Sequence, residues 1–119
     1  MKLLDAVAQH TRHPDTFEIP SAHARSSLRP GDMAKLVILD PHGGGGSREW
    51  ADVTRVVSPG VYEGDLIEEA RPTPVRFTAR HVIDAASGSD VQKGRLVGTA
   101  FKAAMLGAIA YGVYRLVRR

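Results

Sequence analysis

The 119-residue sequence has no cysteine and few aromatic residues, namely one Trp, three Tyr and three Phe. Without thiols, the chain can form no disulfide framework, thiolate metal site or cysteine nucleophile. This absence is compatible with any redox compartment. The aromatic residues are so few that a small core needs at least some of them inside.

Acidic residues slightly outnumber basic residues over most of the chain. Residues 1–84 hold 10 Lys and Arg against 12 Asp and Glu, whereas residues 85–119 hold six basic residues and one acid, Asp90. The net charge of +3 therefore comes from the C-terminal part. Nucleic-acid modules concentrate cations on the folded domain, so we expect no specific nucleic-acid partner. A basic segment beside an apolar run suits an anionic membrane surface better.

Short apolar runs separated by Gly and Pro turns follow one another through the middle of the chain. The clearest predicted strand is 33–39, and others are expected at about 48–57, 61–67, 75–78 and 82–84. Four or five short strands over so few residues predict a small β-barrel or a bent antiparallel sheet.

The flanking segments predict helices. Leu3, Leu4, Val7 and Ala8 share one helical face, and Ser21 is placed to cap a short helix that ends at Ser26 or Ser27. The expected organisation is an N-terminal helix at 1–12, a β head at 13–84, a linker at 85–95 and an apolar C-terminal α-helix at 96–119. The fold class is thus mainly β with a C-terminal helix.

Several short motifs resemble a known family. They are His13-Pro14-Asp15-Thr16-Phe17-Glu18-Ile19-Pro20, Leu28-Arg29-Pro30-Gly31-Asp32-Met33-Ala34-Lys35-Leu36, Trp50, Tyr62-Glu63-Gly64-Asp65-Leu66, and Val75-x-Phe77 before Arg80-His81-Val82-Ile83. In order and spacing, residues 13–84 resemble the small bacterial proteins grouped as domain-of-unknown-function family 2314. The resemblance implies an SH3-like β fold and carries no activity, cofactor or catalytic residue.

The C-terminal segment is the strongest signal in the chain. Twelve residues without charge lie between Lys102 and Arg115. A helix from Leu96 to Val117 would be about 33 Å long, which is enough to cross a bilayer core. The residues expected at the membrane interface are Lys102, Tyr111, Tyr114, Arg115, Arg118 and Arg119.

The two sides of this predicted helix differ. Leu106, Ile109, Val113 and Leu116 make a bulky stripe. Small residues on another side would allow close helix packing, and they are Ala100, Ala104, Gly107, Ala108 and Gly112. Three interpretations stay open, namely a membrane span, burial in an oligomer or large particle, and packing on the chain's own head.

No motif in the head predicts catalysis. The Gly43–Gly46 run leads into a strand and lacks the Lys-Ser/Thr of a phosphate loop, so we expect a hairpin loop. His10 and His13 lack a third metal ligand. The acidic residues at 63–69 indicate a solvated face or a docking surface for a basic partner. We therefore expect no enzyme, no cofactor and no metal.

Aromatic residues offer one candidate binding site. Trp50, Tyr62 and Phe77 could line a groove for proline-rich peptides, although at least one of them is expected in the core. Taken together, the sequence predicts an accessory protein that binds a protein partner or its own copies. We expect it to be membrane-associated, with a cytoplasmic head. The alternatives are a structural subunit of a large soluble particle and, third, a small-ligand or enzyme domain.

Overall fold

The computed structural model describes residues 1–67 and 72–88. Five strands form one antiparallel sheet, and its strand order is β4-β3-β2-β1-β5. The strands are β1 (Met33–Leu39), β2 (Gly46–Ser58), β3 (Val61–Leu66), β4 (Thr73–Thr78) and β5 (Asp84–Ala86). The expectation of a mainly β fold is confirmed at this level, and no pairing closes the sheet between β4 and β5 among the described residues.

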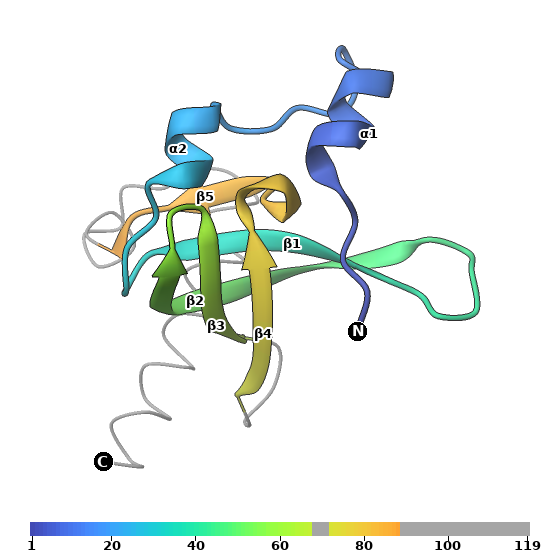
Figure 1. The fold of residues 1–119 in the computed structure, drawn as a ribbon. Coiled ribbons are helices and arrows are strands. Elements are labelled where there is room, and N and C mark those ends of the chain that lie inside the picture. The colour runs from blue at the N-terminus through green and yellow to red at the C-terminus, as the bar shows by residue number, and fades with distance from the viewer. Residues whose placement is uncertain (68–71, 89–119) are drawn as a thin grey trace.

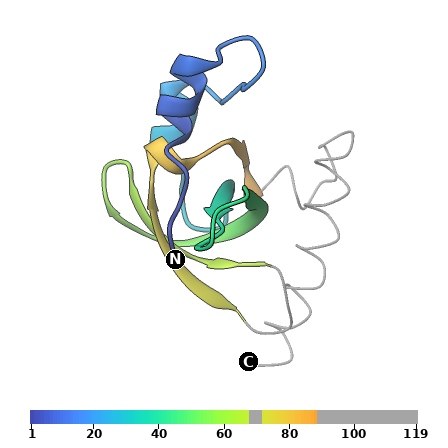
Figure 2. The ribbon, with the colours of Figure 1, turned by 90° about the vertical axis from the view of Figure 1, so that its right-hand side faces the viewer.

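Three short helices lie along one side of the sheet. They are α1 (Ala6–Arg12), α2 (Ala22–Ser26) and the 3-10 helix η1 (Ala79–His81). Figure 1 shows α1 and α2 above the strands, and Figure 2 shows the sheet curling below them. The predicted Ser21 cap is confirmed, because the Ser21 hydroxyl accepts a hydrogen bond from the Ala24 N–H at 3.1 Å.

The N-terminal helix starts later than expected. The Asp5 carboxylate accepts a hydrogen bond from the Ala8 N–H at 3.0 Å, which makes Asp5 the N-cap and Ala6 the first helical residue. Leu3 instead forms a bridge with Ile38. The prediction of a helix over 1–12 is therefore wrong for its first five residues, because pairing with β1 outweighs the helical pattern of Leu3 and Leu4.

The turns follow the sequence closely. Pro30 and Gly31 lie at the turn before β1, where Gly31 has a φ of +96° that favours glycine. The Gly-rich run 43–46 connects β1 to β2, as expected of a hairpin loop, and this hairpin extends beyond the rest of the sheet (Figure 1). The last strand is β5 at Asp84–Ala86, so its end lies inside the segment that composition assigned to the linker 85–95.

The main core lies on the concave side of the sheet. Alternate residues of β1 to β4 point into it, including Leu36, Val53, Tyr62 and Phe77. A second cluster joins α1 and the segment around Phe17 to the other side of β1 at Val37 and Leu39. Each buried strand residue can therefore be assigned to one of the two faces of the sheet.

Candidate functional site

The three aromatic residues of the predicted peptide groove do not lie together on the surface. Tyr62 is 0% exposed and Phe77 is 1% exposed, and their rings pack in the main core with centroids 5.3 Å apart. Trp50 precedes Ala51, which points into that core, so Trp50 points to the opposite face. The groove prediction is wrong for this reason: strand alternation separates Trp50 from the other two rings.

Tyr62 has a structural role that its hydroxyl defines. The hydroxyl donates to the Arg25 carbonyl at 2.9 Å and accepts from the Leu28 N–H at 3.3 Å. The Arg25 side chain in turn donates to the carbonyls of Pro20 and Ala79, both at 3.0 Å. These bonds hold α2 and the following segment against β3 and η1.

The face of the sheet opposite the main core carries a second group of buried residues. Met33, Trp50 and Ala86 are 3%, 6% and 4% exposed, yet none of them belongs to the two clusters described above. We call these three side chains the outer-face patch. Met33 pairs with Ala86 in the ladder between β1 and β5, and Trp50 pairs with Lys35 in the ladder between β1 and β2. The patch therefore spans three neighbouring strands.

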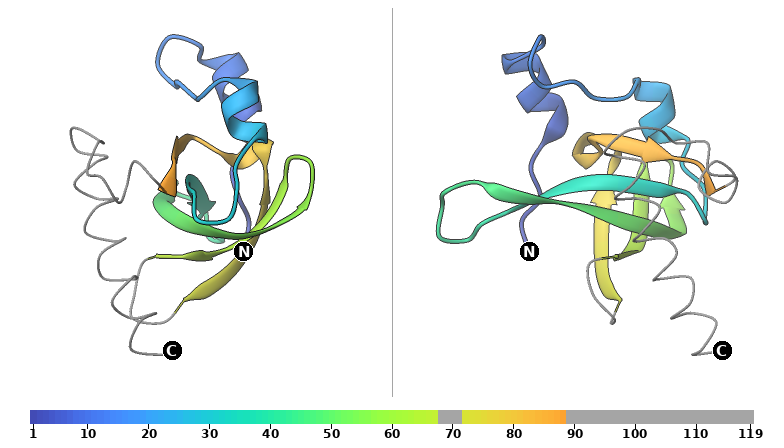
Figure 3. Two further views of the ribbon diagram at one scale, coloured as in Figure 1. Left: turned by 90° about the vertical axis from the view of Figure 1, so that its left-hand side faces the viewer. Right: turned by 180° about the vertical axis from the view of Figure 1, so that it is seen from behind.

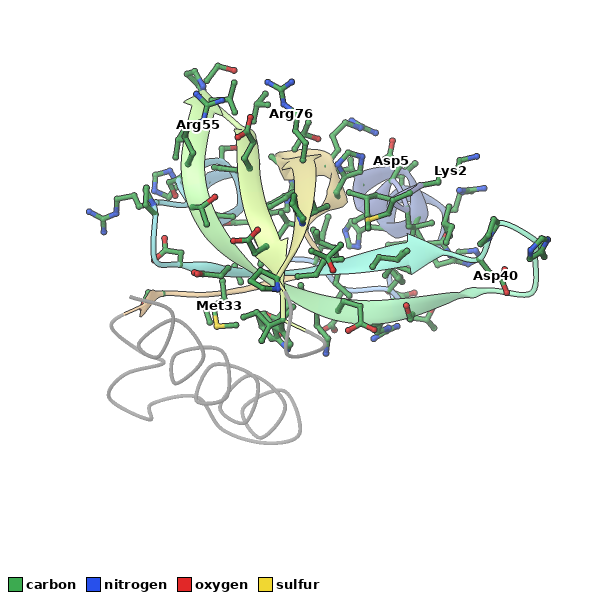
Figure 4. All side chains as sticks on the ribbon, turned by 90° about the horizontal axis from the view of Figure 1, so that it is seen from below. Lys2, Asp5, Met33, Asp40, Arg55 and Arg76 are labelled. Carbon is green, nitrogen blue, oxygen red and sulfur yellow. The ribbon has the colours of Figure 1, made fainter. Side chains whose placement is uncertain are left out.

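Two views place this face relative to the helices. Seen from behind in Figure 3 (right), β5, β1 and β2 lie in front, with α1 and α2 above them. In Figure 4, Met33 lies at the opposite end of the view from Arg55 and Arg76. The two helices contact η1. Val37 and Leu39 lie on the same face of β1 as Met33, so α1 and the segment around Phe17 cover one part of the face that carries the outer-face patch.

Charged residues surround the outer-face patch. Asp52 pairs with Met33 on one side and with Asp65 on the other, so both carboxylates lie on the outer face, and Asp52 is only 7% exposed. The Lys35 ammonium lies 5.6 Å from the centre of the Trp50 ring, in the range of a cation–π interaction. The Trp50 indole N–H is buried and has no hydrogen-bond acceptor among the described residues.

The chain leaves the sheet at a fixed point beside this patch. The Gly88 N–H donates to the Asp32 carboxylate at 3.0 Å, and a Cβ at Gly88 would lie 2.6 Å from the Gly31 carbonyl oxygen. Only glycine fits such a close approach of two backbones. Since Ala86 and Met33 are paired, the segment after Gly88 starts at the edge of the outer-face patch.

A separate open groove of about 690 Å³ lies between the segment 15–20 and the outer side of β1, β2 and β5. Its lining combines Lys35 and Arg48 with carboxylates of Asp15, Glu18 and Asp84. Because both signs of charge are present, this groove selects no single class of charged ligand.

The histidines have local structural roles. His10 Nδ1 lies 2.6 Å from the Phe17 carbonyl, and His81 Nδ1 accepts from the Thr78 N–H at 3.0 Å. Partial burial lowers the pKa of His81, an effect that the Asp5 carboxylate opposes and the Arg80 charge reinforces. Within the described ranges 1–67 and 72–88, no group of three metal-ligating side chains comes together.

The acidic residues expected near 63–69 are only partly described. The Glu63 carboxylate pairs with Arg55 at 2.8 Å, and hydrogen bonding by that guanidinium lowers the Glu63 pKa. Residues 68–71, including Glu68 and Glu69, lie outside the described residues. Of the described acidic residues in this stretch, Glu63 pairs with Arg55, and Asp65 lies opposite the buried Asp52 in the ladder between β2 and β3.

The helix-packing and membrane-interface residues predicted in 96–119 also lie outside the described residues. In the part of the chain that the structure describes, no helix is long and apolar enough to cross a membrane.

Sequence reasoning missed Met33, Asp52 and Ala86 as members of a site. One signal was present, because the strand 33–39 is apolar at all positions except Lys35. A strand that is apolar on both sides is typically covered on both faces. Comparison with known proteins finds no matching family model, curated protein or solved structure.

Proposed function

We propose that this protein is a non-enzymatic interaction protein. Its β head is attached by the C-terminal segment 96–119 to a membrane or a membrane protein complex, with the head on the cytoplasmic side. The observation that carries the proposal is the contrast between the two parts of the chain. The head has a small negative net charge, while the segment after it is apolar, basic and long enough as a helix to cross about 33 Å.

The charge pattern supports the cytoplasmic side. Anionic lipids give the cytoplasmic leaflet a negative surface potential, which attracts basic segments by about 1 kcal/mol per Lys or Arg. Arg115, Arg118 and Arg119 follow the apolar run directly. Together they supply about 3 kcal/mol, or roughly 100-fold in binding.

A flotation assay tests this function. The full chain is mixed with phospholipid vesicles that contain about one quarter anionic lipid, floated on a density gradient and washed with alkaline carbonate. We expect the chain to float and to resist the wash. A triple substitution of Arg115, Arg118 and Arg119 to Gln should weaken vesicle binding by roughly 100-fold.

The matched control removes the same charge from the head, by replacing Arg12, Arg29 and Arg76 with Gln. This triple variant should bind vesicles like the parent chain. A parent chain that stays at the bottom of the gradient at every lipid concentration would refute membrane attachment.

The small-residue stripe favours a second candidate, a structural subunit of a large assembly. Ala100, Ala104, Ala108 and Gly112 recur every four residues and would permit close packing between helices. Replacing Gly107 and Ala108 with Leu keeps the segment apolar but blocks close approach. Light scattering should then show a smaller assembly than the parent forms, whereas an unchanged mass would argue against this packing.

We also propose that the sheet is a small SH3-like barrel of the kind the family 2314 resemblance implies. The strand order and the 13-residue length of β2 support this, since a long bent strand can belong to both halves of a barrel. An NMR structure of the full chain tests it through contacts across the two sheet halves. A flat sheet without such contacts would exclude the barrel.

A further inference from the structure

We propose that His81 is a pH-operated latch in the 3-10 helix η1. Its neutral ring keeps η1 closed and holds the N-terminal segment 1–20 on the sheet, and protonation of the ring releases that segment. Such a latch goes beyond the proposed function, because it controls the shape of the head and not its attachment. The main core stays folded in both states.

The latch depends on one hydrogen bond whose direction is fixed. The Thr78 N–H donates to His81 Nδ1 at 3.0 Å, and this bond is one half of a capping box around η1. A backbone N–H can only donate, so Nδ1 is the ring nitrogen without a proton. An imidazolium carries a proton on both nitrogens and accepts no hydrogen bond. Protonation of His81 therefore breaks this bond.

The ring is the acceptor that the Thr78 N–H has among the described residues. The Ala79 N–H donates to the Gly60 carbonyl at 3.0 Å, and hydrogen bonding alternates along an antiparallel ladder, so the Thr78 N–H points away from β3. The Thr78 hydroxyl lies 3.4 Å from Nδ1 and also accepts from the Arg80 N–H at 3.3 Å. An imidazolium that turned to donate to this hydroxyl would still leave the Thr78 N–H without its acceptor.

η1 joins both N-terminal helices to the sheet. Arg80 pairs with the Asp5 carboxylate at 3.0 Å, and Asp5 is the N-cap of α1. Arg25 of α2 donates to the Ala79 carbonyl at 3.0 Å. Because both contacts end on residues of η1, unwinding of η1 loosens both helices at once.

The segment that η1 holds covers apolar surface of β1. The Leu4 N–H donates to the Val37 carbonyl at 2.9 Å, and the Leu39 N–H donates to the Lys2 carbonyl at 2.8 Å. Val37 belongs to the second cluster, which α1 and the segment around Phe17 complete. Release of the N-terminal segment therefore breaks two backbone hydrogen bonds and exposes this cluster.

Charged groups from every element around η1 act on the ring. The elements that pack against η1 are α1, α2 and β4. With η1 itself, they carry Asp5, His10, Arg12, His13, His23, Arg25, Arg76 and Arg80. Partial burial lowers the pKa of His81 most, the Asp5 carboxylate opposes this effect and the Arg80 charge reinforces it. The closed head thus binds the proton less readily than the open one, so acid favours opening.

Amide hydrogen exchange on the full chain, read by NMR, tests the latch. The reporters are the Leu4 N–H and the Leu39 N–H, which join the N-terminal segment to β1. We expect their protection factors to fall at least about threefold between about pH 7.5 and about pH 5. The Val53 N–H in the main core should keep its protection. Equal losses at all three amides would overturn the proposal, because they would report global unfolding.

Two substitutions separate the latch from a packing role of the ring. His81→Gln keeps an acceptor for the Thr78 N–H, since Gln serves in capping boxes, and it does not titrate. Its two reporters should therefore keep the same protection at both pH values. His81→Ala removes the acceptor, so at about pH 7.5 its reporters should already be at least as weakly protected as those of the parent at about pH 5.

The matched control is His42→Gln, which removes another titrating ring from the exposed hairpin loop. This variant should respond to pH like the parent. A fall in protection of His81→Gln equal to that of the parent would overturn the latch. The nitrogen shifts of the His81 ring give a measurement that needs no variant. At about pH 7.5 they should place the proton on Nε2, and a proton on Nδ1 would also overturn the proposal.

Discussion

Replacing Tyr62 with Phe removes a single hydroxyl from the centre of the head. The ring is fully buried beside Phe77, so Phe fills the same space and no cavity forms. What is lost is the hydrogen bond to the Arg25 carbonyl at 2.9 Å and the bond from the Leu28 N–H at 3.3 Å. Leu28 is only 7% exposed, so water does not readily replace the hydroxyl.

The expected cost follows from these two bonds. A hydrogen bond contributes about 0.5–1.5 kcal/mol, and a buried donor without a partner costs about 1–3 kcal/mol. The Tyr62→Phe substitution should therefore lower the free energy of unfolding by about 2–3 kcal/mol. For a domain of this size, that corresponds to a fall in Tm of roughly 10 °C or more.

Urea denaturation followed by far-UV circular dichroism measures this change. The midpoint should fall while the slope m stays constant, because the exposed surface on unfolding is unchanged. Tyr114→Phe removes the same hydroxyl from the C-terminal segment and should shift stability by less than about 0.5 kcal/mol. Equal stability of Tyr62→Phe and the parent would refute the hydrogen-bonding role of Tyr62.

The same residue predicts a dependence on alkaline pH. Burial raises the pKa of Tyr62 above its usual value of 10.0, the Asp32 charge raises it further, and the hydrogen bond from the Leu28 N–H opposes both. The unfolded chain therefore loses this proton first, so the stability contribution is complete below pH 10 and declines as pH rises above it. Tyr62→Phe should show a smaller decline than the parent.

Three further perturbations test the fold and its electrostatics. Burial lowers the pKa of His81 below 6.5, so the unfolded chain binds a proton more readily than the folded one, and stability should fall as pH drops below about 6.5. The His81→Gln variant should show a smaller fall in its urea midpoint over this pH range, and a pH dependence equal to that of the parent would contradict the prediction. A Cβ at Gly64 would overlap the Asp52 carbonyl oxygen, so Gly64→Ala should lower the free energy of unfolding by more than about 2 kcal/mol. The control Thr54→Ala, at an exposed neighbouring position, should lower it by under about 1 kcal/mol. Asp5→Asn removes the exposed ion pair with Arg80 but keeps a capping side chain, so it should lower the free energy of unfolding by under about 1 kcal/mol. Asp5→Ala removes the cap as well and should cost about 1 kcal/mol more. Equal losses of stability in the two variants would assign the effect to the ion pair.

The agreement between sequence and structure is closest where the signal is local. Ser21 and the Pro30-Gly31 turn act through neighbours three or fewer residues away, and both are found as expected. The bounds of β5 depended on pairing with β1, so the Ala85 and Ala86 positions looked like linker by composition. Leu3 similarly left its predicted helix to pair with Ile38.

The sequence by itself determined the mainly β class, the turns and the split between an acidic head and a basic apolar segment. Each of these depends on residues close together in the chain. The tertiary structure alone decided which face each aromatic ring takes, because one residue of register moves a side chain across the sheet. It therefore separated Trp50 from Tyr62 and Phe77, and it placed Trp50 beside Met33, Ala86 and the fixed exit of the chain at Gly88.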